Sequence, residues 1–179
     1  MNTQHLIFKQ TVAAILVAVV ATLLAFIRYP MVIPSGTINC QVVVPVLLAA
    51  FLVLDRRFGA VTFVLTAVAT FLLGLSDWQA VVCWLLAIIA ALLLEHVRFS
   101  DELVLSHNAL ILLRLLAGLC QFLTTIIIYA LIGLNLGGSA GLRSFIALTW
   151  PVGLADGLLT ALLTAPLTML LRWVMKQIN

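Results

Sequence analysis

The chain has 179 residues, of which 65% are hydrophobic and only 8% charged, and its formal net charge is +3. Soluble domains carry about a quarter charged residues, so this composition excludes the soluble, disordered and coiled-coil classes. It predicts an integral membrane protein, and the few basic residues form no stripe of the kind that binds nucleic acid.

Charged residues divide the sequence into long apolar runs. The first run lies between Lys9 and Arg28 and is long enough to cross a bilayer, whose core of about 30 Å needs about 20 helical residues. Each of the last two runs is interrupted by one charge, Arg114 or Asp156. Helices are predicted because lipid offers the backbone no hydrogen-bond partners. We therefore predict an all-α integral membrane protein in which residues 1–179 form one domain of six transmembrane helices, at approximately 11–27, 40–54, 58–75, 78–94, 109–133 and 145–171.

The first predicted span is rich in alanine. Ala14 and Ala18 are four residues apart, so they lie on one face of a helix and allow another helix to approach closely. That second helix can belong to this chain or to another protein, and the sequence leaves both possibilities open.

A long connection follows the first span, from Arg28 to Gln41. It contains two prolines, a glycine and the apolar stretch 31–33. Long loops are usually functional or disordered, and apolar residues favour a loop that packs on the rest of the protein. We predict an extended outer loop that acts as a lid over a pocket, with Asn39 among the ligand contacts.

The basic residues predict the orientation in the membrane. If the N-terminus is cytoplasmic, most basic side chains fall on the cytoplasmic side, which fits the positive-inside rule. Six spans return the C-terminus to the cytoplasm, and we expect a multi-pass protein of a bacterial inner membrane. The cytoplasmic group is Lys9, Arg56, Arg57, Arg98, Arg172 and Lys176, and the outer group is Arg28 and Arg143.

Polar residues inside the later spans are candidate ligand contacts, because such groups face the interior of a membrane bundle. Gln121, Thr125 and Tyr129 are four residues apart and share one helix face. The alternative role for this face is hydrogen bonding between helices. Asp156 is either a ligand contact or the buried partner of Arg114.

Trp84 lies almost two turns inside its predicted span. Trp78, Trp150 and Trp173 lie at span ends instead, where tryptophan normally anchors a helix in the interface. An aromatic ring near amide and hydroxyl groups is typical of a small-molecule site. The predicted ligand-binding residues are therefore Trp84, Gln121, Thr125, Tyr129, Asp156 and Asn39.

Motifs for catalysis and metal binding are weak. The cysteines and histidines lack the spacing of a metal or redox site, so we expect no metal and no cofactor. Residues 137–141 match G-x-S-x-G, but no strand precedes them and no histidine follows, so a glycine-rich turn is favoured. No phosphate-binding loop motif occurs, and we do not expect an enzyme.

Several motifs spread over nearly the whole chain together resemble a known family. They are the alanine pair at 14 and 18, IPSGTIN at 33–39, RRFGA at 56–60 and APL at 165–167. With six short-looped spans, they resemble the substrate-binding S components of energy-coupling factor (ECF) vitamin transporters. The resemblance implies capture of a vitamin or related micronutrient from outside, between helices four to six and under the first loop. It also implies ATP-driven uptake by a T component, docked on Ala14 and Ala18, and by two ATPase subunits.

Two alternatives come from other functional classes. The rod-shape-determining MreD family has a similar size and six-helix pattern, and would make the chain a scaffold of the cell-wall elongation complex. The acidic and aromatic signatures expected of that family are not evident at residues 73–78, where Asp77 is the single acidic residue. A small intramembrane enzyme would use Asp156 or Ser139, and neither has an evident base.

Overall fold

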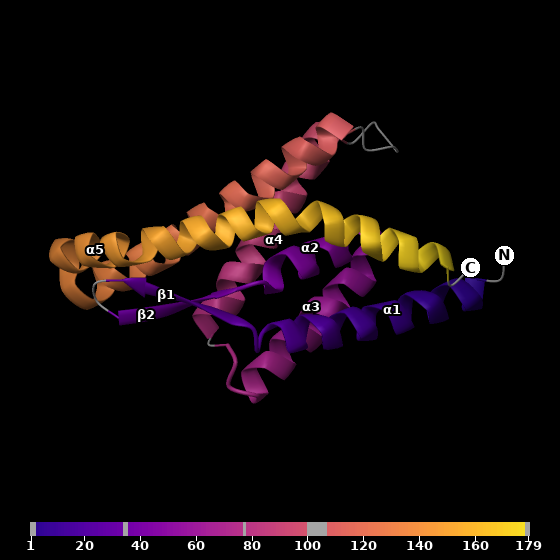
Figure 1. Cartoon of the computed structure of the whole chain (residues 1–179), viewed down its shortest axis with the longest axis horizontal. Coiled ribbons are helices and arrows are strands. Elements are labelled where there is room, and N and C mark those ends of the chain that lie inside the picture. The colour runs from indigo at the N-terminus through magenta and orange to yellow at the C-terminus, as the bar shows by residue number, and fades with distance from the viewer. Residues whose placement is uncertain (1–2, 34–35, 77, 100–106, 178–179) are drawn as a thin grey trace.

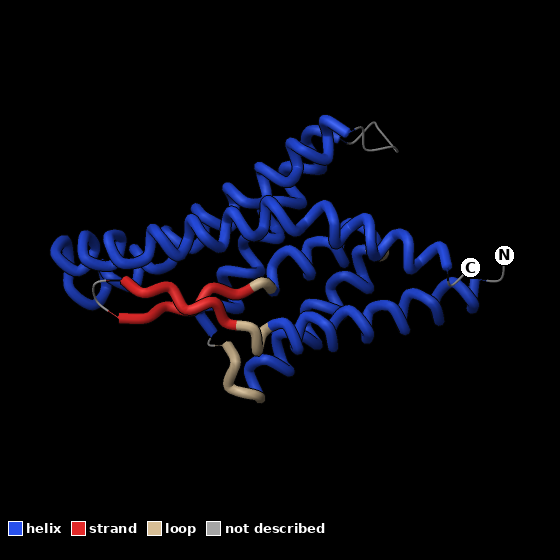
Figure 2. The backbone as a smooth tube through the Cα atoms, viewed as in Figure 1, coloured by secondary structure: helices blue, strands red, loops and turns tan. Residues whose placement is uncertain are grey.

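The computed structural model describes residues 3–33, 36–76, 78–99 and 107–177 (Figure 1). Apart from one β-hairpin, the regular elements in these ranges are helices (Figure 2), which agrees with the predicted all-α class. In chain order the elements are α1 (Thr3–Leu24), β1 (Arg28–Ile33), β2 (Gly36–Gln41), α2 (Val43–Val53), α3 (Arg56–Leu72), α4 (Trp78–Phe99) and α5 (His107–Gln177).

Element α5 is a pair of antiparallel helices. The backbone leaves the helical conformation at Gly137 (φ −146°, ψ 20°) and Gly138 (φ 57°, ψ −142°). The positive φ of Gly138 is one that glycine adopts at little cost, and this allows the chain to reverse. The two arms are 107–136 and 139–177, so the described ranges contain six helical segments. The turn between the arms is shorter than the gap between the two predicted spans.

The two arms of α5 approach closely because glycines face each other. A Cβ atom added to Gly118 would lie 2.5 Å from the carbonyl oxygen of Gly157, and one added to Gly157 would lie 2.7 Å from that of Gly118. Gly153 lies against Phe122 in the same interface. Larger side chains at the paired glycines would push the arms apart.

Helix α2 is the centre of the molecule. Its first eight residues, Val43 to Ala50, are all buried, and it packs against α1, α3, α4 and α5. Its 11 residues extend for about 16 Å, about half the thickness of a bilayer core. Helix α2 is therefore shorter than the predicted span at 40–54 and is too short to cross a membrane by itself.

Helices α1 and α3 pack through alanines and threonines. Ala14 and Thr62 are both fully buried. The hydroxyl of Thr62 lies 2.9 Å from the carbonyl oxygen of Phe58 in its own helix and 3.4 Å from that of Ala14 in α1. The short side chains let the helices come together, and the polar hydroxyl is satisfied by carbonyl groups.

The predicted loop at 28–41 forms an antiparallel hairpin instead. Arg28 pairs with Gln41 at its base and Ile33 with Gly36 near its tip. Its β-branched residues, which include Val32 and Ile38, favour strands. Strand β2 contacts α5. Figure 1 shows the hairpin and the turn of α5 at one end of the molecule, and the terminal ends of α1 and α5 at the other.

Large apolar side chains are exposed on the outside of the helices. Examples are Leu16 on α1, Val64 on α3, Leu85 on α4, and Leu115 and Leu158 on α5. Among the described residues, two helical stretches are long and apolar enough to cross a membrane, Leu6–Leu24 and Arg114–Gln177. Val43–Val53 and Ala80–Ala90 are shorter apolar stretches.

Candidate functional site

Gln121 and Thr125 lie on the same buried face of the first α5 arm. The side chain of Gln121 is 3% exposed and that of Thr125 is 4% exposed. The Thr125 hydroxyl donates to the backbone carbonyl of Gln121 at 2.9 Å, and Nε2 of Gln121 donates to the Thr125 hydroxyl oxygen at 3.5 Å. The two residues thus form one buried polar group on this arm.

The Oε1 atom of Gln121 is buried and has no hydrogen-bond partner. Exchanging the oxygen and nitrogen of the amide would leave an N–H group without a partner instead, so either orientation leaves one polar atom unsatisfied. An unsatisfied buried polar atom costs about 1–3 kcal/mol. A ligand that donates a hydrogen bond to this oxygen would recover that free energy.

Gln121 lies near the start of α2. Ala117, one turn earlier on the first α5 arm, packs against Leu48 of α2. Figure 1 shows that α2 and this arm run in opposite directions, so Gln121 lies on the hairpin side of the Ala117–Leu48 contact. At that end of α2, the N-cap residue Val42 makes no side-chain capping hydrogen bond.

Asp156 is half-buried on the second α5 arm. The contacts of Gly157 with Gly118 and of Gly153 with Phe122 place it at the same level as Gln121 along the two arms. Asp156 also precedes three buried threonines at four-residue intervals, so it extends a polar stripe on this arm. The threonines are Thr160, Thr164 and Thr168.

The guanidinium group of Arg114 joins the two arms of α5. Its Nε donates to the carbonyl of Ala161 at 2.9 Å and its Nη2 donates to that of Leu162 at 3.3 Å. Pro166 explains the second of these acceptors, because proline has no N–H group to donate to the carbonyl four residues earlier, that of Leu162. These acceptors lie more than one helical turn from Asp156, the partner considered for Arg114 from the sequence.

Trp84 lies in the apolar core. It is buried in a cluster with residues of α1, α2 and α4, among them Ala21, Val43 and Ile88. Tyr129 is half-buried, two turns beyond Gln121 on the same arm. Asn39 pairs with Pro30 in the hairpin, and its side chain lies outside the described residues.

Ala14 and Ala18 are buried inside the chain. Their exposed fractions are 0% and 5%. Ala14 lies against Thr62 of α3 and packs with Ala50 and Leu54 of α2, while Ala18 lines the cavity between α1 and α3. Of the two arrangements that the sequence left open, the structure shows packing within the chain. Docking of another protein on these alanines stays a prediction.

Two threonine stripes were not predicted from the sequence. Thr62, Thr66 and Thr70 on α3 are fully buried, and the later stripe on the second α5 arm is nearly so. In each stripe the second and third hydroxyls donate to the carbonyl of the preceding threonine at 2.6–2.8 Å. Their four-residue spacing is visible in the sequence and marks two helix faces that turn inward.

The described residues line several cavities, and three of them are almost wholly apolar. They lie between α1, α2 and α5, between α1 and α3, and between α3 and α4, and none includes a predicted ligand-binding residue. Within the described ranges, no group of three or more His, Cys, Asp or Glu side chains could hold a metal ion. No protein-family model, curated protein or solved structure matches the chain.

Proposed function

We propose that the chain is the membrane-embedded S component of an ECF-type transporter, which captures a vitamin or related micronutrient at the hairpin end. In this proposal all six helical segments lie in the membrane and both termini are cytoplasmic. The hairpin covers the bound ligand, and a T component with two ATPase subunits drives its release inside.

The distribution of side chains supports the membrane placement. Apolar side chains point outward on several helices, while threonines and Gln121 are buried. Water-soluble monomers rarely expose contiguous apolar patches larger than a few hundred Å². Arg172 and Lys176 are exposed at the end of α5 that carries the C-terminus, as expected for a cytoplasmic face.

The unpartnered Oε1 of Gln121 is the observation that carries the binding proposal. Thr125 is its neighbour, and Asp156 lies at the same level on the other arm. An amide oxygen near a carboxylate suits a ligand with N–H donors or a positive charge, as in a pyrimidine or pyridine vitamin. Burial makes a hydrogen bond to this oxygen selective, because a ligand without the donor leaves the oxygen unsatisfied.

Mass spectrometry of the small molecules extracted from the purified protein tests this proposal. The wild-type protein is expected to carry one, and Gln121→Leu is expected to lose it. Gln10→Leu is the matched control, because the Oε1 of Gln10 is also buried and unpartnered but lies near the opposite end, on α1. Absence of any small molecule from the wild-type protein, or equal loss in both variants, would contradict the proposal.

A further inference from the structure

Helix α2 begins inside the bundle. It ends at Val53, next to the turn into α3 on the side of the termini, and its 11 residues extend for about 16 Å towards the hairpin. In the proposed membrane placement, its start therefore lies about half-way across a bilayer core of about 30 Å. Val43 and Val44 form this start and are buried. Strand β2 ends at Gln41, so the start of α2 adjoins the base of the hairpin.

The first turn of α2 presents backbone N–H donors that the helix cannot satisfy. The first N–H groups of an α-helix have no acceptor one turn earlier in the helix, and they carry the positive end of its dipole. Pro45 has no N–H group, so the donors here are those of Val43 and Val44, and the N-cap residue Val42 supplies no side-chain acceptor. In membrane transporters, helices that begin inside the bilayer point such N–H groups at acceptor atoms of the substrate, such as a carboxylate.

The unpartnered Oε1 of Gln121, whose side chain is only 3% exposed, lies beside this turn. Gln121 is one turn beyond Ala117 on the same face of its arm, and Ala117 packs against Leu48 of α2. Val44 is one turn before Leu48 on the same face of α2, and the two helices run in opposite directions (Figure 1). A step of about 6 Å towards the hairpin therefore leads from the Ala117–Leu48 contact to Gln121 and Val44 together.

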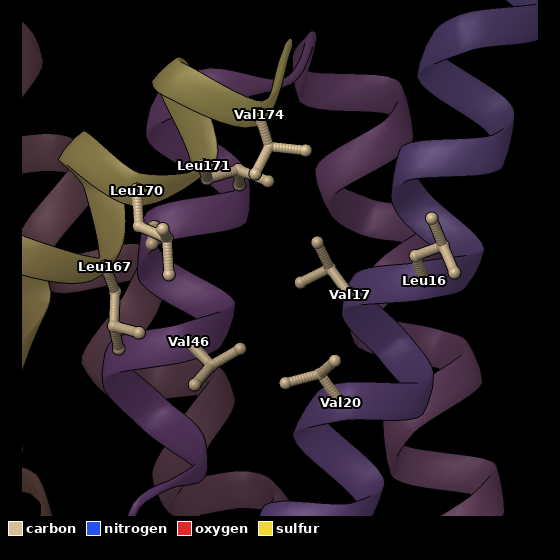
Figure 3. Close-up of a pocket in the computed structure, with 9 residues that line it drawn as sticks. Leu16, Val17, Val20, Val46, Leu167, Leu170, Leu171 and Val174 are labelled. Carbon is tan, nitrogen blue, oxygen red and sulfur yellow. The ribbon is translucent and has the colours of Figure 1, made fainter. Parts of the chain in front are cut away.

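The apolar groove between α1, α2 and α5 lies on another side of α2. Figure 3 shows Val46 of α2 facing α1 across this groove. Residues two apart on a helix point about 200° apart, so Val46 points away from the side on which Val44 and Leu48 lie. The N–H donors of the first turn and the acceptor of Gln121 thus form a polar site that is separate from the groove.

We propose that the ligand of this polar site is a neutral molecule with an amide-type edge, in which an N–H group and a carbonyl oxygen are adjacent. Its N–H group donates to Oε1 of Gln121, and its carbonyl oxygen accepts from the N–H groups at the start of α2. The inference rests on the proposed binding function and specifies the chemical class of the ligand.

The charges around the site favour a neutral ligand. A carboxylate has no donor for Gln121, and Asp156, at the same level on the other arm, repels it. An amidinium has no acceptor for the N–H groups of α2, and the positive end of the helix dipole repels it. A neutral amide satisfies both partners and meets neither repulsion.

Three probes with the same ring test this class of ligand. Benzamide has the donor and the acceptor side by side, benzoate has acceptors only, and benzamidinium has donors only. Their dissociation constants for the purified protein in detergent micelles are measured by ligand-observed NMR. Benzamide is expected to bind about tenfold more tightly than either charged probe, because each of those leaves one buried partner unsatisfied. Equal or tighter binding of a charged probe, or no binding of benzamide, would overturn the inference.

A backbone ester tests the contribution of α2. α-Hydroxyvaline in place of Val44 turns the N–H group into an ester oxygen, keeps the side chain, and is expected to weaken benzamide binding about tenfold. The same replacement of Val53 at the far end of α2 is the matched control, because its N–H group has the carbonyl of Ala49 as an acceptor within the helix. Binding unchanged by the ester at Val44, or weakened equally by both esters, would overturn the inference.

Gln121→Leu removes the acceptor instead of the donors. It is expected to weaken benzamide binding about tenfold, while Gln10→Leu leaves the binding unchanged. An equal effect of these two variants would overturn the inference.

The outcomes for the ligand class and for the proposed function are distinguishable. If the wild-type protein retains a small molecule that Gln121→Leu loses, but binds benzoate more tightly than benzamide, only the inference on the ligand class is wrong. If the wild-type protein retains no small molecule, the proposed function fails, while benzamide binding that depends on the N–H group of Val44 still supports a site of this class.

Discussion

Two helix pairs in this protein pack closely through small residues. They differ in the side chain that donates hydrogen bonds across the interface, which is a neutral threonine in one pair and a charged arginine in the other. Between α1 and α3, Ala14 meets Thr62, and the contact across the interface is a hydroxyl 3.4 Å from a carbonyl. Between the arms of α5, Gly118 meets Gly157, and Arg114 adds two hydrogen bonds to carbonyls of the opposite arm.

Pro166 accounts for one of the two hydrogen bonds of Arg114, that to the carbonyl of Leu162. An uninterrupted helix such as α3 has no carbonyl left over in its interior, so close packing of small side chains is sufficient. Proline leaves the carbonyl of Leu162 without its usual donor, and an unsatisfied carbonyl is costly away from water. A cation on the neighbouring arm satisfies it, which also fixes how the two arms are aligned.

The largest expected effect is at the glycine contact. Gly118→Ala places a methyl group 2.5 Å from the carbonyl oxygen of Gly157, so the arms must separate and stability falls by about 3 kcal/mol. Gly137→Ala is the control, because a Cβ atom there meets nothing within 4 Å. Reversible unfolding in detergent micelles measures both, and equal effects would show that the arms are not in close contact.

The next effect concerns the cation. Arg114→Met removes hydrogen bonds from a charged donor and is expected to cost about 2 kcal/mol in the same measurement. In the Pro166→Ala background the cost is expected to fall, since an alanine in place of the proline supplies the N–H group that the carbonyl of Leu162 lacks. An equal cost in both backgrounds would disprove the link between Arg114 and Pro166.

The smallest effect is expected between α1 and α3. Thr62→Val keeps the shape of the side chain and removes a hydroxyl that already bonds within its own helix, so the loss is about 0.6 kcal/mol or less. A loss as large as that for Arg114 would mean that the 3.4 Å contact with Ala14 contributes far more than its length suggests.

The sequence predicts helices well because apolar runs and charges are local features. It misses the hairpin at 28–41, where β-branched residues outweigh the prolines that suggest a loop. The sequence also predicts too long a helix around Val46. The predicted span begins at residue 40, but residues 40 and 41 belong to strand β2 and the helix begins at Val43.

The candidate site is harder to predict, because it depends on how distant segments align. The spacing of Gln121 and Thr125 correctly predicts a shared face. The acceptors of Arg114 could not be found from charge alone, since both are backbone carbonyls, and Pro166 frees only one of them, that of Leu162. The two threonine stripes could have been predicted from their four-residue spacing. The prediction from the sequence rested instead on other polar residues of the spans, among them Gln121 and Asp156.

In the proposed function, the unsatisfied oxygen of Gln121 inside the bundle accepts a hydrogen bond from the ligand. The most direct measurement compares wild type and Gln121→Leu for both the retained small molecule and the unfolding free energy of the empty protein. We expect the variant to lose the small molecule while the empty protein becomes more stable, by about 1 kcal/mol. A variant that retains the same small molecule, or that is less stable when empty, would contradict it.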